Sequence, residues 1–143
     1  MRTEIASLGE FGLIDRLTEG IILEYDSSKY GVGDDVAVLS YSSEKQVLVT
    51  TDLLMEGVHF DLTYVPLKHL GYKSAVVNFS DIYAMNGTPR LITVSLGLSK
   101  RFSVEDMDEL YSGIRLACQQ YKVDIVGGDT TSSLTGLAIS ITC

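Results

Sequence analysis

Helical and strand-like patterns alternate along the second half of the sequence, and this alternation is the feature that most limits the possible folds. Apolar residues recur at steps of three and four over residues 66–85 and 103–122, which predicts two amphipathic helices. Runs with strand character lie between and after them, at 91–98, 123–126 and 137–142. This order of elements predicts a mixed α/β (α+β) domain, in which helices pack on one face of a mixed β-sheet.

The first half of the chain predicts one more helix and a β-hairpin. Apolar residues at helical spacing indicate a helix over 10–25, and a turn-rich stretch follows at 26–33. Two strand-like runs, 36–41 and 46–51, flank a short polar segment and are typical of a hairpin. The pattern puts Asp52 at the end of the second strand, ahead of an irregular stretch.

The size and charge of the chain exclude several classes of protein. With 143 residues, of which 45% are hydrophobic and 21% charged, it is typical of one globular domain. A formal charge of −8 with few, scattered basic residues argues against a nucleic-acid surface. No apolar run approaches the roughly 20 residues of a membrane span and no secretory signal is evident, so we expect a cytoplasmic protein. Cys118 and Cys143 lack partners at metal-ligand spacing, and we expect them to be buried.

Four short segments share one design, an aspartate where a predicted strand or helix gives way to a turn rich in Gly, Ser or Thr. They lie at 33–35, 50–52, 78–81 and 127–131. Carboxylates beside hydroxyls and carbonyls form an all-oxygen donor set, which suits Mg²⁺. If the segments converge, two carboxylates 4 Å apart would repel by about 4 kcal/mol at an effective dielectric of 20. Cations would have to neutralise them, and several Mg²⁺ ions bridging a polyphosphate would do so.

Each of these segments also has an ordinary structural explanation when taken alone. A Gly-Asp pair such as Gly33-Asp34 is typical of a turn in which the aspartate caps its own backbone. Asp81 could be a polar interruption of a helix, although an unpaired aspartate in apolar surroundings is costly. His59 is isolated and could be a structural hydrogen-bonding residue or a catalyst, and His69 is assigned no role. The number of segments is what favours a metal site.

Read together, five stretches of the sequence resemble the thiamine-monophosphate kinase family, within the aminoimidazole ribonucleotide synthetase superfamily. They lie at 9–14, 31–37, 50–60, 78–85 and 127–131, in the order in which the family has them. The stretch from Asp52 to the His59-Phe60 pair is the most discriminating. The Gly-Asp-Asp and Gly-Gly-Asp-Thr pieces also suit other members of the superfamily.

This resemblance implies a set of site residues and a reaction. The implied magnesium ligands are Asp35, Thr50, Thr51, Asp52, Asp81 and Asp129. His59 would contact the thiamine phosphate, and Gly128, Asp129 and Tyr111 would contact ATP. The implied reaction transfers the γ-phosphoryl group of ATP to thiamine monophosphate and gives thiamine diphosphate, with no side chain as covalent or acid–base catalyst.

The resemblance covers only the N-terminal half of the family. Residues 1–143 would be the N-terminal domain that binds ATP and Mg²⁺, whereas family members continue into a second domain with further contacts. We therefore expect the isolated fragment to be inactive, and we expect the domain to form a homodimer through its sheet edges. Two alternatives stay open, another ATP-using enzyme of the superfamily and a non-catalytic module that binds metal or nucleotide. Neither nucleic acid nor a membrane is an expected partner.

Overall fold

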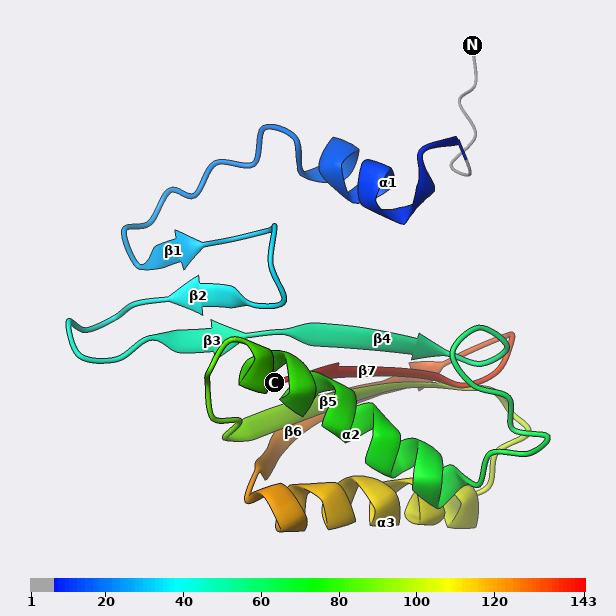
Figure 1. Cartoon of the computed structure of the whole chain (residues 1–143). Coiled ribbons are helices and arrows are strands. Elements are labelled where there is room, and N and C mark those ends of the chain that lie inside the picture. Colours follow the sequence, from blue (N-terminus) through cyan, green and yellow to red (C-terminus); the bar gives the residue numbers. More distant parts are fainter. Residues whose placement is uncertain (1–6) are drawn as a thin grey trace.

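The computed structural model describes residues 7–143, which form three helices and two sheets (Figure 1). The elements are α1 (Gly9–Thr18), β1 (Ser28–Tyr30), β2 (Ala37–Leu39), β3 (Val47–Val49), β4 (Thr51–Met55), α2 (Leu67–Ala84), β5 (Leu91–Leu98), α3 (Val104–Tyr121), β6 (Asp124–Ser132) and β7 (Ala138–Thr142). Sheet A has the order β1-β2-β3, and sheet B has the order β4-β7-β5-β6. No helix of residues 7–143 is both long and apolar enough to cross a membrane.

Sheet B and the two long helices form the packed body of the molecule. Strand β7 pairs antiparallel with β4 and β5, while β5 pairs parallel with β6, and α3 makes the connection between these two parallel strands. Helices α2 and α3 both lie on one face of sheet B (Figure 1). The predicted fold class, a mixed sheet with helices on one face, is therefore confirmed.

The core lies between the two helices and sheet B. In β5 every second residue is buried, as expected for a strand with one covered face. The fully or almost fully buried apolar side chains are Leu54, Ile92, Val94, Leu96, Ile139 and Ile141 from the sheet, and Leu70, Ala75, Phe79, Ile82, Leu110, Ile114 and Ala117 from the helices. Cys118 and Cys143 are also buried as predicted, and burial raises the pKa of the Cys118 thiol to about 11.

Helices α2 and α3 cross at two glycines. A Cβ atom at Gly71 would run into the backbone carbonyl of Leu110, and one at Gly113 would run into that of Lys68. Each helix backbone therefore rests directly on the other. The start of α3 is fixed by the predicted capping box, in which Ser103 Oγ accepts from the Asp106 N–H (3.2 Å) and the Asp106 carboxylate accepts from the Ser103 N–H (2.8 Å).

Three predictions for the first half of the chain are wrong. Helix α1 ends at Thr18 because Gly20 adopts a φ of 81°, and the predicted turn-rich stretch contains the short strand β1. The chain leaves sheet A after β3 and enters sheet B at β4, so Asp52 lies near the start of β4 and the segment after it is not wholly irregular.

The glycine- and threonine-rich stretch at 127–131 was also wrongly predicted, because it is strand rather than turn. Parallel pairing with β5 continues through Gly127, Asp129 and Thr131 as far as Ser132. Every residue of β6 is exposed, and the strand is an edge of sheet B that pairs only with β5. Periodic burial was therefore not available as a strand signal in this sequence.

Candidate functional site

The side chain of Thr50 joins three of the predicted site segments. Its hydroxyl lies 3.1 Å from the backbone carbonyl oxygen of Asp35 and 3.1 Å from Oδ2 of Asp81, so its single proton can bond either oxygen. Thr50 is only 7% exposed, and its N–H and C=O both pair with Cys143 at 3.0 Å. The backbone of sheet B thus holds the hydroxyl in place between the turn before β2 and helix α2.

Asp52 lies close to this group on the helix-covered face of sheet B. Side chains alternate along β4, so Asp52 shares the face of the buried Leu54, and Thr50 precedes it on the same side. Burial raises the pKa of the Asp52 carboxyl, the negative charge of Asp81 raises it further, and His59 acts in the opposite direction. Two carboxylates therefore repel each other beside the Thr50 hydroxyl.

The loop after β4 orients the ring of His59. The ring Nδ1 accepts a hydrogen bond from the Met55 N–H at 2.9 Å, and the backbone N–H of His59 donates to the Met55 carbonyl at 2.9 Å. The Lys73 ammonium donates to the His59 carbonyl at 3.1 Å. With Nδ1 occupied as an acceptor, the neutral ring carries its proton on Nε2, and the exposed side chain can offer that N–H to an anion.

Thr51 and Asp129 lie on the other, open face of sheet B. The Thr51 hydroxyl is 3.1 Å from both the Ile141 carbonyl and the Thr142 hydroxyl, and Asp129 stands in register with Ser95 of β5. Strands β4 and β6 are opposite edges of the four-stranded sheet, so their residues are separated by about 14 Å at the usual strand spacing. Within one chain, the structure therefore does not bring Asp129 to Thr51 or Asp52.

Gly128 has a structural reason to be glycine. A Cβ atom there would run into the backbone carbonyl of Val94, the residue of β5 that stands in register with Gly128. Gly127 has no such constraint, since the nearest atom to a Cβ would be Thr93 Cγ2 at 3.9 Å. Gly128 thus allows the backbones of β5 and β6 to approach each other closely.

Tyr111 lies away from the other predicted site residues. It is half-buried on α3, the guanidinium carbon of Arg115 lies 5.9 Å from its ring centre, and burial raises the pKa of its hydroxyl. It lines a hollow of about 310 Å³ with Leu98, Phe102, Ser103, Val104, Met107, Asp108 and Arg115. None of the other predicted site residues lines this hollow.

The donor chemistry around Thr50 fits Mg²⁺, although the carboxylates are not gathered into a complete set. The groups that converge are a carbonyl, a hydroxyl and a carboxylate, all hard oxygen donors. Asn78, one helical turn before Asp81, is fully buried, and within residues 7–143 its Oδ1 has no hydrogen-bond partner while its Nδ2 donates to the Ser74 carbonyl. In the same residues, no three His, Cys, Asp or Glu side chains lie close enough to hold a metal ion.

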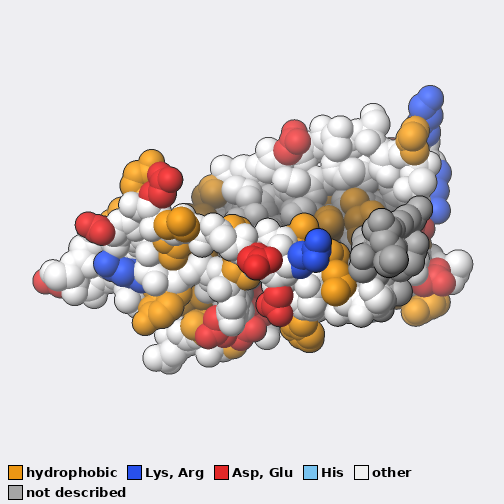
Figure 2. All heavy atoms as spheres, turned by 90° about the horizontal axis from the view of Figure 1, so that it is seen from above, with side chains coloured by type: hydrophobic (Ala, Val, Ile, Leu, Met, Phe, Trp, Pro, Cys, Tyr) orange, Lys and Arg blue, Asp and Glu red, His pale blue; other side chains and the backbone are white. Residues whose placement is uncertain are grey.

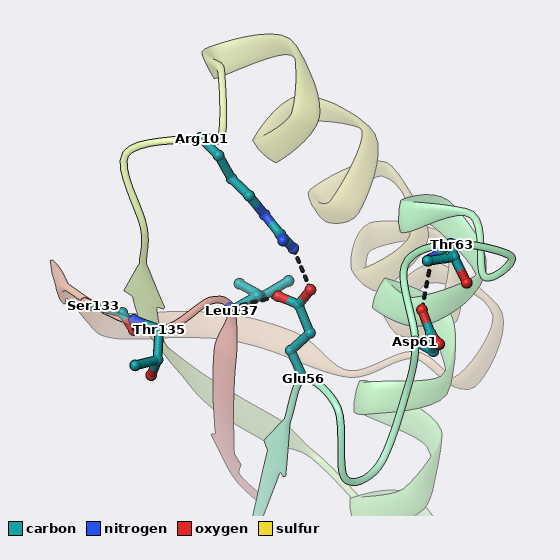
Figure 3. A network of polar contacts seen from close by, with 7 residues as sticks. All are labelled: Glu56, Asp61, Thr63, Arg101, Ser133, Thr135 and Leu137. Atoms are coloured by element: carbon teal, nitrogen blue, oxygen red, sulfur yellow. Dashed lines mark hydrogen bonds and ion pairs between the residues drawn. The ribbon is translucent and has the colours of Figure 1, made fainter.

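One polar residue that the sequence analysis missed connects three loops at one end of sheet B. The carboxylate of Glu56 forms an ion pair with Arg101 from the β5–α3 loop and accepts from the Leu137 N–H at 2.9 Å (Figure 3). Burial alone would raise the pKa of the Glu56 carboxyl. The hydrogen bonds from Arg101 and Leu137 lower it by more, so the pKa of Glu56 lies below its usual value. Glu56 falls inside the most discriminating stretch of the sequence, and that position was the available signal.

Comparison with known proteins gives a consistent set of similarities. The family described as AIR synthase related protein, N-terminal domain, matches residues 33–143. A thiamine-monophosphate kinase of Aquifex aeolicus (strain VF5) is 40% identical over 129 residues, covering 90% of this chain and 40% of the relative. One of Bacillus subtilis (strain 168) is 35% identical over 135 residues, covering 94% and 41%.

A solved structure, AaThiL complexed with AMPPCP and TMP, matches with a TM-score of 0.85 and 37% identity. The match covers 99% of this chain and 43% of that one. The chain thus spans about 40% of the length of the curated relatives it matches.

Proposed function

The chain belongs to the AIR synthase related protein family through that family's N-terminal domain, and on this basis we propose that it is the ATP- and magnesium-binding part of a thiamine-monophosphate kinase. Residues 1–143 would form this one domain, and a second domain would follow in the complete protein. Relatives named thiamine-monophosphate kinase at 40% and 35% identity support the proposal. The observation that carries it is the meeting of Asp35, Thr50 and Asp81 through one hydroxyl group.

In this proposal the γ-phosphoryl group of ATP passes to thiamine monophosphate, and the protein acts by positioning and charge neutralisation. The proposed magnesium ligands are Asp35, Thr50, Thr51, Asp52, Asp81 and Asp129. Bound Mg²⁺ would neutralise the negative charge of the phosphates. Thr50 would hold Asp81 in place. Asp52 and Asp81 repel each other, and a cation bound between them would relieve this repulsion.

We propose that His59 contacts the phosphate of the acceptor. Its Nδ1 is engaged by the Met55 N–H, which leaves the Nε2–H as the donor for a phosphate oxygen. Gly128 and Asp129 are proposed to contact ATP, and AMPPCP bound in the AaThiL neighbour supports a nucleotide as co-substrate. The proposed ATP contact of Tyr111 rests on the family resemblance alone, because its hollow is separate.

A homodimer would explain how Asp129 meets Thr51. Asp129 and Thr51 lie on opposite edge strands of one sheet, about 14 Å apart, which is too far to share an ion. If the β6 edge of one copy lies beside the β4 edge of another, each site receives Asp129 from one chain and Thr51, which lies on the same open face, from the other. The fully exposed β6 edge supports such pairing. A cytoplasmic location remains a prediction from the sequence.

The test of the proposed reaction uses the full-length protein with ATP, Mg²⁺ and thiamine monophosphate. We expect thiamine diphosphate and ADP as products, and Asp81→Asn should lower kcat by roughly 100-fold or more. The control is Asp15→Asn, on the exposed surface of α1, which should leave kcat unchanged. Binding of ATP and thiamine monophosphate without any product would instead favour a non-catalytic module.

The shared site has its own test. Thr51→Ala and Asp129→Asn should each have little activity alone, because each removes a proposed ligand from every shared site. Mixed and re-associated one to one, they should regain activity corresponding to about a quarter of the wild-type sites, since one site of each mixed dimer is intact. Failure of the mixture to regain activity, in a sample shown to contain mixed dimers, would contradict the shared site.

A further inference from the structure

Helix α1 and the residues after it carry a row of exposed apolar side chains. Phe11 is 81% exposed and Leu17 is 70% exposed, and beyond the end of the helix Ile21 and Ile22 are 60% and 80% exposed. Helix α1 buries none of its residues and lies apart from the packed body (Figure 1). Seen from the side on which α1 lies, the surface shows apolar side chains among acidic ones (Figure 2).

Such a row needs a partner to be stable in water. Isolated helices shorter than about 12–15 residues are marginal in water, and α1 has 10 residues. An amphipathic helix gains its stability from packing its apolar face, yet here that face meets no core. The cover therefore has to come from outside residues 7–143.

We infer that this row, made of Phe11, Ile14, Leu17, Ile21 and Ile22, docks onto the second domain of the same chain. The inference rests on the proposed function, in which residues 1–143 are part of a longer protein. The family's N-terminal domain model begins at residue 33, so α1 lies outside that module. The AaThiL match nevertheless covers 99% of this chain, and it accounts for only 43% of AaThiL, which leaves more than half of that chain as a possible cover.

The area of the row is too small to hold a second copy by itself. Five apolar side chains bury roughly 300–600 Å² when fully covered. A stable interface between separate proteins needs about 800 Å² from each partner. A domain on the same chain has no such requirement, because the linker keeps its local concentration high. The row is therefore the size of an interdomain contact.

Photo-crosslinking in the full-length protein tests the inference. Phe11 is replaced by the photoreactive residue p-benzoyl-phenylalanine, and the crosslinked peptides are mapped by mass spectrometry. We expect a product of monomer mass in which residue 11 is joined to a residue beyond 143. The matched control carries the same photoreactive residue at Leu134, which is 100% exposed in the β6–β7 loop and should give little product.

Three outcomes would overturn the inference: a product of dimer mass, a crosslink to residues 1–143, or a yield at position 11 no higher than at position 134. Crosslinking needs no turnover, so a crosslinked but inactive protein would refute the kinase and leave the docking in place. As a second measurement, Phe11→Ser should lower the Tm of the full-length protein by about 2 °C or more, whereas Leu134→Ser should not change it.

Discussion

The packed body at residues 50–143 and the N-terminal arm at residues 7–49 have similar apolar patterns but opposite burial. Leu70 and Leu110 in the body are completely buried, whereas Phe11 and Ile22 in the arm are 81% and 80% exposed. In the body, two helices and four strands cover each other's apolar faces. Hydrophobic periodicity thus identifies an apolar face in both regions, but it does not say whether the same domain covers that face.

The arm differs because its own sheet is too small to form a second core. Its three strands have three residues each, and the buried apolar residues of the arm are Val38 in β2 and Val36 just before that strand. A sheet of this size gives α1 no surface to pack on. Matched substitutions in the two regions test this difference in packing.

The largest effect is expected from removing core volume. Leu110→Ala truncates a fully buried side chain of α3 and should lower the free energy of unfolding by about 3 kcal/mol. The matched change Leu17→Ala removes a side chain that is 70% exposed and should cost less than about 0.5 kcal/mol in the 143-residue chain. Urea unfolding followed by circular dichroism measures both values. Equal losses of unfolding free energy would mean that the arm is packed as tightly as the body.

A smaller effect is expected from adding volume at the helix crossing. In Gly113→Ala the new methyl group meets the Lys68 carbonyl of α2, and the helices must separate at a cost of about 2 kcal/mol. In Gly12→Ala the new Cβ has room, 3.4 Å from Leu8 Cβ, so α1 should gain helicity without a change in global stability. The same urea and circular dichroism measurements apply, and a stable Gly113→Ala protein would mean that the crossing is loose.

The difference between body and arm also explains which parts of the fold could be predicted from the sequence. Helices α2 and α3 and strands β5 and β7 were predicted because each has a periodic apolar face, and in α3 a capping box marks the start. The end of α1 and the strand nature of 127–131 were missed. Helix α1 stops at a backbone conformation of Gly20, and β6 depends on pairing with a distant strand. Neither property is visible in a local pattern.

The site was predictable in residue types but not in geometry. The oxygen donors at Asp35, Thr50 and Asp81 do come together, as their number and chemistry indicated. The sequence did not reveal that Asp129 lies on the opposite edge and face of sheet B from Asp52, because strand order is set by non-local pairing. The loop-connecting role of Glu56 was missed for the same reason, since its partners lie far along the chain.

A smaller loss of stability than at the helix crossing is expected at Glu56, a charged side chain that is mostly covered within the body. Glu56→Ala leaves the Leu137 N–H without its acceptor and should cost about 1–2 kcal/mol of unfolding free energy. Arg101→Gln removes only the partly exposed ion pair, since the Arg101 side chain is 52% exposed, and should cost less than about 1 kcal/mol. Thermal unfolding of both variants gives the ranking. If the two losses were equal, the ion pair rather than the Leu137 hydrogen bond would hold the loops together.

The smallest effect, and the one with the opposite sign, is expected at Asp52. Its pKa is raised above the unfolded value of 3.8, so folding favours the protonated carboxyl; this stabilising contribution is complete below pH 3.8 and is lost as the pH rises through the folded pKa. At pH 7 the ionised Asp52 therefore works against folding when no cation is present. Asp52→Asn should raise the Tm at pH 7, and the gain should disappear on acidification below about pH 3.8.

Magnesium turns this small effect into a test of function. If Asp52 is a ligand, Mg²⁺ should raise the Tm of the wild-type full-length protein at pH 7 and should raise that of Asp52→Asn much less. Asp15→Asn in the arm should respond to Mg²⁺ as the wild type does, because that exposed side chain has no proposed ligand role. An equal Mg²⁺ response in wild type and Asp52→Asn would mean that the raised pKa of Asp52 reflects its burial and Asp81 alone, and that the body binds its cation elsewhere.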